Sequence, residues 1–177
     1  MSYLRRKHPK MHCYLLRKRD KIPRMTTELD KTDRSILRLL QKNAALSVDE
    51  VSAQVHLSRN ACWRRIKAME QAGVIKARVA LVDPASAGVP LTAMVLIRTS
   101  AHDAAWIKKF QSTLQSFPEV VGAYRMTGDL DYVLRVRVAD VPAYDAFYKR
   151  LTSRISESDI SASFVMEEIK DTTAVPI

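Results

Sequence analysis

A row of polar side chains between residues 58 and 73 has the chemistry needed to contact nucleic acid. At 100° per residue, Asn60, Arg64 and Lys67 fall on one side of a helix, together with Gln71. Arg and Lys neutralise phosphates, Arg also binds guanine O6 and N7, and Asn pairs with adenine N6 and N7. A solvated helix face has a similar composition, so the neighbouring elements must decide between the two interpretations.

The other side of this segment is apolar, which predicts a helix that packs inward. Cys62, Ile66 and Met69 form the apolar stripe, Ser58 is a suitable N-cap, and Gly73 suits the position after the last turn. The residues expected to meet DNA lie on or beside the polar side. They are Ser58, Arg59, Asn60, Trp63, Arg64, Arg65 and Lys67.

Two more helices are predicted upstream. The segment from Asp30 to Asn43 is amphipathic and Leu-rich, and Ser47 begins a short helix that ends near His56. A tight turn then leads into the basic helix, which is the pattern of a helix-turn-helix. Because one helix pair cannot bury its own apolar faces, the Leu-rich helix completes a three-helix, winged-type DNA-binding domain over residues 25–74.

The stretch TGDLDY at 127–132 is the second candidate site. A glycine flanked by two carboxylates suits a plain hairpin turn. The same carboxylates could accept from an ammonium group while main-chain N–H groups donate to a carboxylate, so the turn could instead hold an amino acid. The residues assigned to this effector site are Tyr124, Met126, Thr127, Gly128, Asp129 and Asp131.

The second half of the chain has the element order of a ferredoxin-like domain, β-α-β-β-α-β, over residues 91–177. Its first helix is expected to turn Ala105, Trp106, Phe110 and Leu114 inward. Both helices should cover one face of the sheet, and a second copy of the chain is the expected cover for the other. Strands are expected at 91–99, 120–128, 131–139 and 161–170, and helices at 102–117 and 142–155.

Residues 75–90 are expected to form a hinge strand and a linker between the two domains. Apolar residues recur from Val74 to Val82, which favours extended structure, and Pro84 and Pro90 mark the boundary. The chain is therefore assigned to the α+β class.

Charge is distributed unevenly along the 177 residues. The net charge is +10 at pH 7, of which residues 1–24 contribute +8, residues 25–80 contribute +4 and residues 81–177 contribute −2. This asymmetry is typical of a protein with one half that meets phosphates and another that meets protein or a small ligand. Residues 1–24 are expected to be a disordered basic extension, with Met25 as a candidate native start.

No sequence pattern indicates catalysis, a metal site or a cofactor. The two Cys are far apart without a CxxC, the four His are scattered, and neither a nucleophile elbow nor a Gly-rich phosphate loop occurs. No apolar run reaches the roughly 20 residues that span a bilayer. We therefore expect a cytoplasmic protein that is not an enzyme and does not enter a membrane.

From about Leu29 to Ile177 the chain resembles the leucine-responsive regulatory protein and asparagine regulator (Lrp/AsnC) family of transcription regulators. The matching stretches are LDKTDRSILRLLQKNAALS, LSRNACWRRIKAMEQAGVI, LVDP, FPEVVGAYRMTGDLDYVLRV and EEIKDTTAVPI. The resemblance implies a helix-turn-helix domain, a hinge strand and an effector domain that binds a small ligand, commonly an amino acid, near TGDLDY. It also implies homodimers joined through their sheets, which often assemble into octamers.

The beginning of the recognition helix departs from this family, because Arg59, Asn60 and Ala61 stand where Pro, Thr and Pro are common. The predicted function is a sequence-specific regulator that binds double-stranded DNA under the control of a small effector. An architectural DNA-binding protein without small-molecule control is the first alternative. An enzyme subunit that uses its helical domain for protein contacts is the second.

Overall fold

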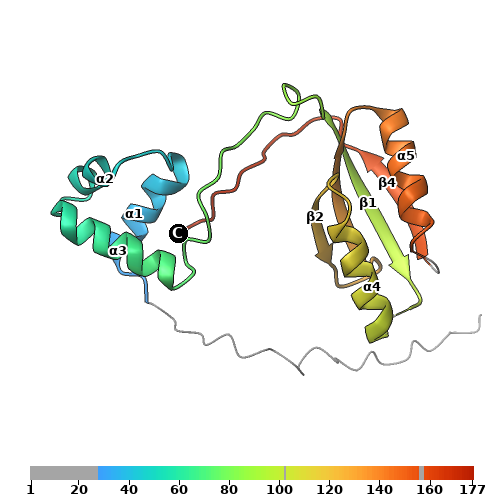
Figure 1. The fold of residues 1–177 in the computed structure, drawn as a ribbon, viewed down its shortest axis with the longest axis horizontal. Coiled ribbons are helices and arrows are strands. Elements are labelled where there is room, and N and C mark those ends of the chain that lie inside the picture. The colour runs from blue at the N-terminus through green and yellow to red at the C-terminus, as the bar shows by residue number, and fades with distance from the viewer. Residues whose placement is uncertain (1–27, 102, 156–157) are drawn as a thin grey trace, which may run out of the picture. The chain divides into compact units, whose positions relative to one another are not determined.

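The computed structural model describes residues 28–101, 103–155 and 158–177. The chain divides into two compact units (Figure 1). The first, called the helical unit here, comprises the described residues up to Arg78 together with Ala174–Ile177, and the second, the sheet unit, comprises the described residues of Val79–Thr173. The predicted basic extension and the candidate start at Met25 lie outside the described residues.

The helical unit consists of three helices that begin at the predicted caps. They are α1 (Lys31–Lys42), α2 (Val48–Gln54) and α3 (Arg59–Gln71), with Asp30, Ser47 and Ser58 as their N-caps. Asp30 and Ser47 each form a capping box, in which the side chain accepts from the backbone of the third helical residue and that residue's carboxylate accepts in return. Backbone groups that a helix end leaves unsatisfied are thereby paired.

The turn between α2 and α3 is as tight as the sequence predicts. His56 adopts a φ of 55°, and the Leu57 N–H donates to the Ser52 carbonyl at 3.0 Å. The apolar side of α3 packs inward as expected. The buried core of the helical unit consists of Ile36, Leu37, Val51, Cys62, Ile66 and Met69.

The sheet unit has the predicted ferredoxin-like order. Its elements are β1 (Leu91–Thr99), α4 (Ala104–Gln115), β2 (Val120–Arg125), β3 (Tyr132–Val138), α5 (Val141–Thr152) and β4 (Ser158–Phe164). All neighbouring strands are antiparallel, in the order β2-β3-β1-β4 (Figure 1). Side chains of α4 and α5 share one buried core with alternate residues of β1 and β3, so both helices cover the same face.

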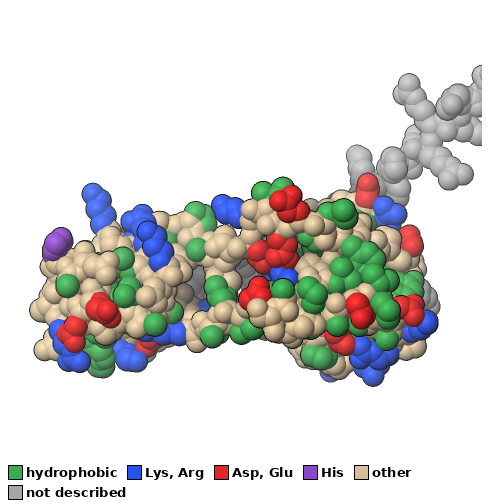
Figure 2. All heavy atoms as spheres, turned by 90° about the horizontal axis from the view of Figure 1, so that it is seen from above, with side chains coloured by type: hydrophobic (Ala, Val, Ile, Leu, Met, Phe, Trp, Pro, Cys, Tyr) green, Lys and Arg blue, Asp and Glu red, His purple; other side chains and the backbone are tan. Residues whose placement is uncertain are grey.

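The alternation predicted for β3 is confirmed, because Tyr132, Leu134, Val136 and Val138 are buried and the residues between them are only half-buried. The half-buried residues of β3 lie on the face of the sheet that no helix covers, which is called the open face here. Across from it on β1, Met94 and Leu96 are also half-buried. The open face therefore presents both apolar and charged side chains, and Figure 2 shows apolar and acidic side chains on the surface of this unit.

Strand β4 lies earlier in the chain than its predicted range of 161–170. It pairs with β1 from Ser158 opposite Thr99 to Phe164 opposite Ala93, and the Val165 N–H then donates to the Thr92 carbonyl at 2.9 Å. Because β1 begins at residue 91, the chain beyond 165 has no strand left to pair with. Similarly, β2 ends at residue 125 rather than 128, where the turn begins.

Two other expectations differ from the structure. Ala105 was predicted to face inward but is exposed, because the inner stripe of α4 runs through Trp106, Phe110 and Leu114. Residues 75–90 contain no strand. A strand needs a partner for its backbone groups, and no described segment of the same chain pairs with this one.

Candidate DNA-binding and effector sites

The exposed side of α3 carries the polar residues that the sequence singled out. Asn60, Arg64 and Lys67 are exposed, as is the Trp63 ring, with an exposed fraction of 52%. Lys67 donates to the Glu70 carboxylate at 2.7 Å. Amide, guanidinium, ammonium and aromatic groups on one helix face can contact both base edges and the DNA backbone.

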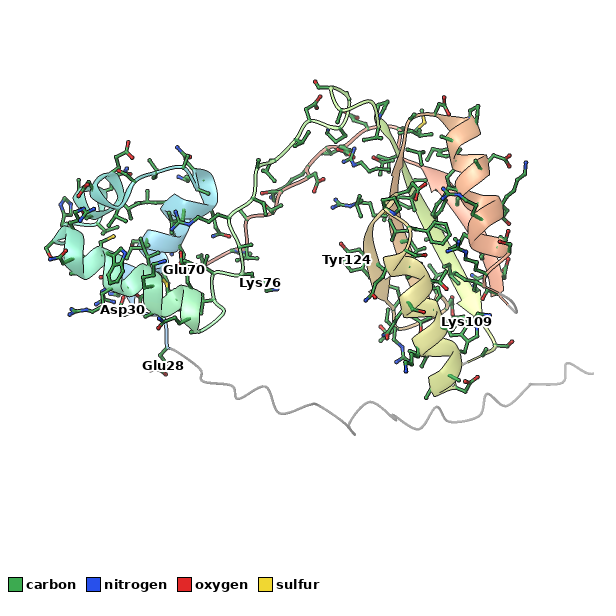
Figure 3. The ribbon with its side chains drawn as sticks, viewed as in Figure 1. Glu28, Asp30, Glu70, Lys76, Lys109 and Tyr124 are labelled. Carbon is green, nitrogen blue, oxygen red and sulfur yellow. The ribbon has the colours of Figure 1, made fainter. Side chains whose placement is uncertain are left out.

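Arg65 does not share this face. Its guanidinium donates to the Asp30 carboxylate at 2.7 Å and to the Asp33 carboxylate at 2.9 Å, which ties α3 to the first turn of α1. Figure 3 labels Asp30 at that end of the helix. Arg59 is also engaged within the unit, where it pairs with Asp49 at 3.0 Å, although both side chains are well exposed.

These contacts shift the pKa values of Asp30 and Arg65. The backbone N–H of Asp33 and the Arg65 guanidinium hold the pKa of Asp30 below its ordinary value of 3.8. The hydrogen bonds to Asp33 and Asp30 in turn raise the pKa of Arg65. Both shifts favour the charged forms, so Asp30 and Arg65 carry opposite charges at neutral pH in the contact between α3 and α1.

The TGDLDY segment forms the loop between β2 and β3. The Met126 N–H donates to the Asp131 carbonyl at 2.8 Å and closes the loop, in which Gly128 has a φ of 105° that favours glycine. Tyr124 and Met126 have exposed fractions of 54% and 44%, and Thr127 is exposed as well. Figure 3 labels Tyr124 on β2 at the edge of the sheet.

The two carboxylates of the loop differ in their surroundings. Asp131 accepts from the Thr99 N–H at 2.8 Å, and its own N–H donates to the Ile97 carbonyl at 3.0 Å, so it joins the loop to the end of β1. The Asp129 carboxylate is exposed and has no partner in the described part of the chain. Of the two, Asp129 is the more exposed.

Residues outside the predicted site also shape the loop. Arg98 donates to the Asp129 carbonyl at 3.0 Å, and Thr99 supplies the N–H bound by Asp131. Neither residue is among those predicted for the site, because both belong to β1 and reach the loop only through the register that pairs Ile97 with Tyr132. Pairing the predicted strands 91–99 and 131–139 with each other could have identified Arg98 and Thr99 from the sequence.

Within residues 28–101, 103–155 and 158–177, no three His, Cys, Asp or Glu side chains are grouped so that they could hold a metal ion. No helix among these residues has the length and hydrophobicity required to cross a lipid bilayer.

Comparison with known proteins agrees with this architecture. Residues 29–76 match the family model for a winged helix-turn-helix DNA-binding domain, and residues 92–175 match that of the Lrp/AsnC ligand binding domain. The DNA-binding transcriptional activator DecR of Escherichia coli K12 is 45% identical over 150 residues, which cover 84% of this chain and 99% of the relative. The chain belongs to the Lrp/AsnC family of transcription regulators.

Two solved structures of this family are similar to the chain over nearly their whole length. An AsnC family regulator from Agrobacterium tumefaciens is 50% identical with a TM-score of 0.81, covering 83% of this chain and 96% of that one. A transcriptional regulator of Neisseria meningitidis, solved in complex with L-methionine, is 35% identical with a TM-score of 0.77, covering 84% and 96%. These relatives are regulators rather than enzymes.

The neighbouring residues Arg64 and Arg65 allow a matched test of the two sides of α3. Arg65→Met keeps an unbranched apolar stem but removes the guanidinium that pairs with Asp30 and Asp33, so it should lower the unfolding temperature of the helical unit by about 5 °C. Arg64→Met should leave that temperature unchanged and weaken DNA binding.

Since the chain has two tryptophans, one in each unit, a Trp106→Phe background makes Trp63 fluorescence report on the helical unit alone. Equal melting of the two variants would contradict this assignment.

Proposed function

We propose that this transcription regulator reads its operator with the exposed face of α3 and responds to an amino acid bound at the loop between β2 and β3. The observation that carries the DNA-binding part is the arrangement of Asn60, Trp63, Arg64 and Lys67 on one exposed side of a helix held at a tight turn. Ser58 and Arg59 begin the same helix and lie where backbone phosphates would approach its N-terminus. Arg65 is assigned a positioning role.

DNA from the region upstream of the protein's own gene provides the first test. Binding should weaken by about a thousandfold or more between 50 and 200 mM salt if six to ten phosphates are contacted. Asn60→Ala should cost roughly 1–3 kcal/mol on the specific site, while binding to random DNA changes little. Gln111→Ala, which removes an exposed amide from α4, is the control and should change neither. An equal loss on both DNAs would instead make Asn60 a backbone contact.

The effector part is supported by the chemistry of the loop and by the relative solved with L-methionine. The Asp129 carboxylate can accept from the ammonium group of an amino acid, and Gly128 leaves the backbone accessible because it has no side chain. Exposed Tyr124 and Met126 offer apolar surface beside the loop. A free amino acid carries three groups that could meet these features: an ammonium, a carboxylate and a side chain.

Titration calorimetry with each of the twenty amino acids tests this site. The amino acid that binds the wild-type protein should bind Asp129→Ala at least tenfold more weakly, because the variant loses a hydrogen bond between charged groups, which contributes about 1.5–3 kcal/mol. Asp145→Ala removes an exposed carboxylate on α5 and should bind normally. Wild-type affinity in Asp129→Ala would place the ligand elsewhere. If none of the twenty alters DNA affinity, architectural binding without an effector becomes the better account.

Self-association is the third part of the proposal. The open face of the sheet carries half-buried Met94, Leu96 and Val133, and the linker exposes Val79 and Leu81, with exposed fractions of 68% and 75%. A second copy of the chain can cover the sheet and also supply the strand that the linker lacks. Dimers joined in this way are the units from which family octamers would be assembled.

Light scattering measures the mass of the assembly in solution and so tests self-association directly. We expect a mass of about twice the 20.1 kDa of one chain, or a higher even multiple, at micromolar concentration. Leu96→Glu should shift the protein towards the monomer, because a carboxylate on the open face would lose its hydration in the interface. A wild-type protein that remains at the mass of one chain would contradict the proposal.

A further inference from the structure

The first turn of the recognition helix contains an arginine that is paired with a carboxylate of the preceding helix. Arg59 is the first residue of α3, and Asp49 is the second residue of α2. The Arg59 Nε lies 3.0 Å from Asp49 Oδ1, and the two side chains have exposed fractions of 68% and 67%. Both residues belong to the helical unit. The pair therefore joins the two helices of the helix-turn-helix at the surface of that unit.

This exposed ion pair contributes little to folding. Pairs on a protein surface stabilise the fold only slightly, because water screens both charges and two long side chains lose conformational freedom. Asp49 also lies in the first turn of α2, where a carboxylate is favourable with or without an arginine beside it. Holding Arg59 in place therefore matters more for what α3 contacts than for the stability of the unit.

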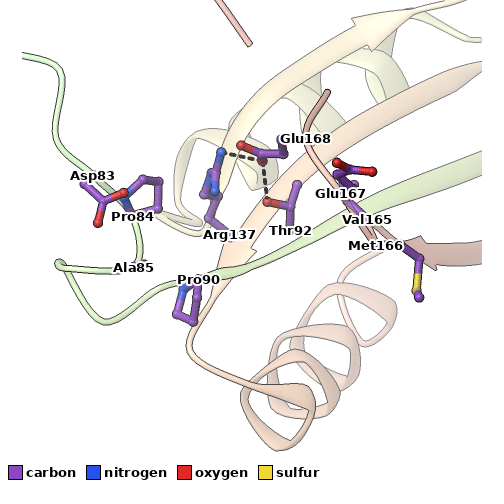
Figure 4. A pocket seen from close by; sticks show the side chains of 10 residues that line it. All are labelled: Asp83, Pro84, Ala85, Pro90, Thr92, Arg137, Val165, Met166, Glu167 and Glu168. Carbon is purple, nitrogen blue, oxygen red and sulfur yellow. Dashed lines mark hydrogen bonds and ion pairs between the residues drawn. The ribbon is translucent and has the colours of Figure 1, made fainter. Parts of the chain in front are cut away.

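Arginines that support the fold have different surroundings. Arg65 binds two carboxylates of α1. In the sheet unit, the Arg137 side chain has an exposed fraction of only 13% and pairs with Glu168 at 2.7 Å (Figure 4). Arg59 is well exposed, and within the described residues no second carboxylate pairs with it and no hydrogen bond engages its Nη1 or Nη2. Two of its three nitrogens thus keep their donors for another partner.

We propose that Arg59 reads a guanine of the operator through its Nη1 and Nη2 groups, and that Asp49 is the residue that positions it. The proposal rests on the proposed reading of DNA by α3 and names one of its base contacts. An arginine can donate two hydrogen bonds to O6 and N7 of guanine in the major groove, and this contact specifies the base. The N-terminal residues of a recognition helix are the ones that reach base edges there.

Asp49 makes guanine a better partner for Arg59 than a backbone phosphate. A phosphate is an anion, and the carboxylate that lies 3.0 Å from Arg59 Nε repels it. The O6 and N7 atoms of guanine carry no net charge, so they meet much less of this repulsion. The carboxylate also restricts the rotamers of Arg59, which reduces the conformational entropy lost on binding. The position of Arg59 at the start of α3 suits either partner, and its ion pair favours the base.

Selection from a pool of DNA duplexes with randomised positions tests the contact, with the full chain as the binder. The wild-type protein should enrich a guanine at one position of its site, preferred over adenine by about tenfold or more. Arg59→Ala should lose this preference while the preferences at other positions remain. Arg34→Ala removes an exposed arginine from α1 of the same unit and should keep every preference. A guanine preference that survives in Arg59→Ala would overturn the proposal.

Affinities for two duplexes test the role of Asp49. One is the selected duplex, and in the other that G·C pair is replaced by A·T. Asp49→Asn removes the carboxylate but keeps the size of the side chain, and it should reduce discrimination between the duplexes about two- to fivefold. Asp145→Asn makes the same change in an exposed ion pair on α5 and should leave discrimination unaltered. If Asp49→Asn only strengthens binding to both duplexes equally, the carboxylate repels phosphates without positioning Arg59, and the proposal fails.

The same measurements separate this proposal from the wider function. A wild-type protein that enriches no sequence would contradict base reading by α3 as a whole. A selected site that depends on Asn60 but not on Arg59 would keep α3 as the reading helix and overturn only the guanine contact. If Arg59→Ala weakens both duplexes equally and lowers the slope of log affinity against log salt by about one, Arg59 contacts a phosphate instead of guanine.

Discussion

The placement of the recognition helix depends on the fork of hydrogen bonds from Arg65 to Asp30 and Asp33. The apolar stripe of α3 decides which side faces the core, but apolar packing is non-directional and leaves rotation and sliding weakly constrained. A guanidinium that binds two carboxylates has a defined geometry. These carboxylates also form the capping box of α1, so the start of one helix and the orientation of another are determined by the same three side chains.

Local features of this chain were predictable from sequence, because their causes lie within a few residues. The caps at Asp30, Ser47 and Ser58 and the alternation along β3 follow from short-range hydrogen bonding and from the period of each element. The bounds of β4 could not be predicted from sequence, since they depend on where its partner strand β1 begins. Likewise Arg65, one of three consecutive basic or aromatic residues on α3, could be assigned to the inner side only once α1 was in place.

The loop between β2 and β3, which is the proposed effector site, shows the same limit at finer scale. TGDLDY presents two aspartates that look equivalent in sequence, yet the structure commits Asp131 to the backbone of β1 and leaves Asp129 exposed. The difference arises from strand register, which brings Thr99 opposite the end of the loop. The hydrogen bond from the Thr99 N–H orients the Asp131 carboxylate, and a loop held in this way stays ordered without a ligand.

The return of the chain to its first domain has a consequence for biosynthesis. Domains near the N-terminus usually fold first as the ribosome delivers them. Here Arg38 and Gln41 on α1 contact residues that lie 139 and 134 positions later in the sequence. The three helices can therefore form early, but their packing is completed only after the whole sheet unit has been synthesised. A nascent chain stalled partway would present the DNA-reading helix on an unfinished core, and a finished protein would acquire its sensor and its full stability together.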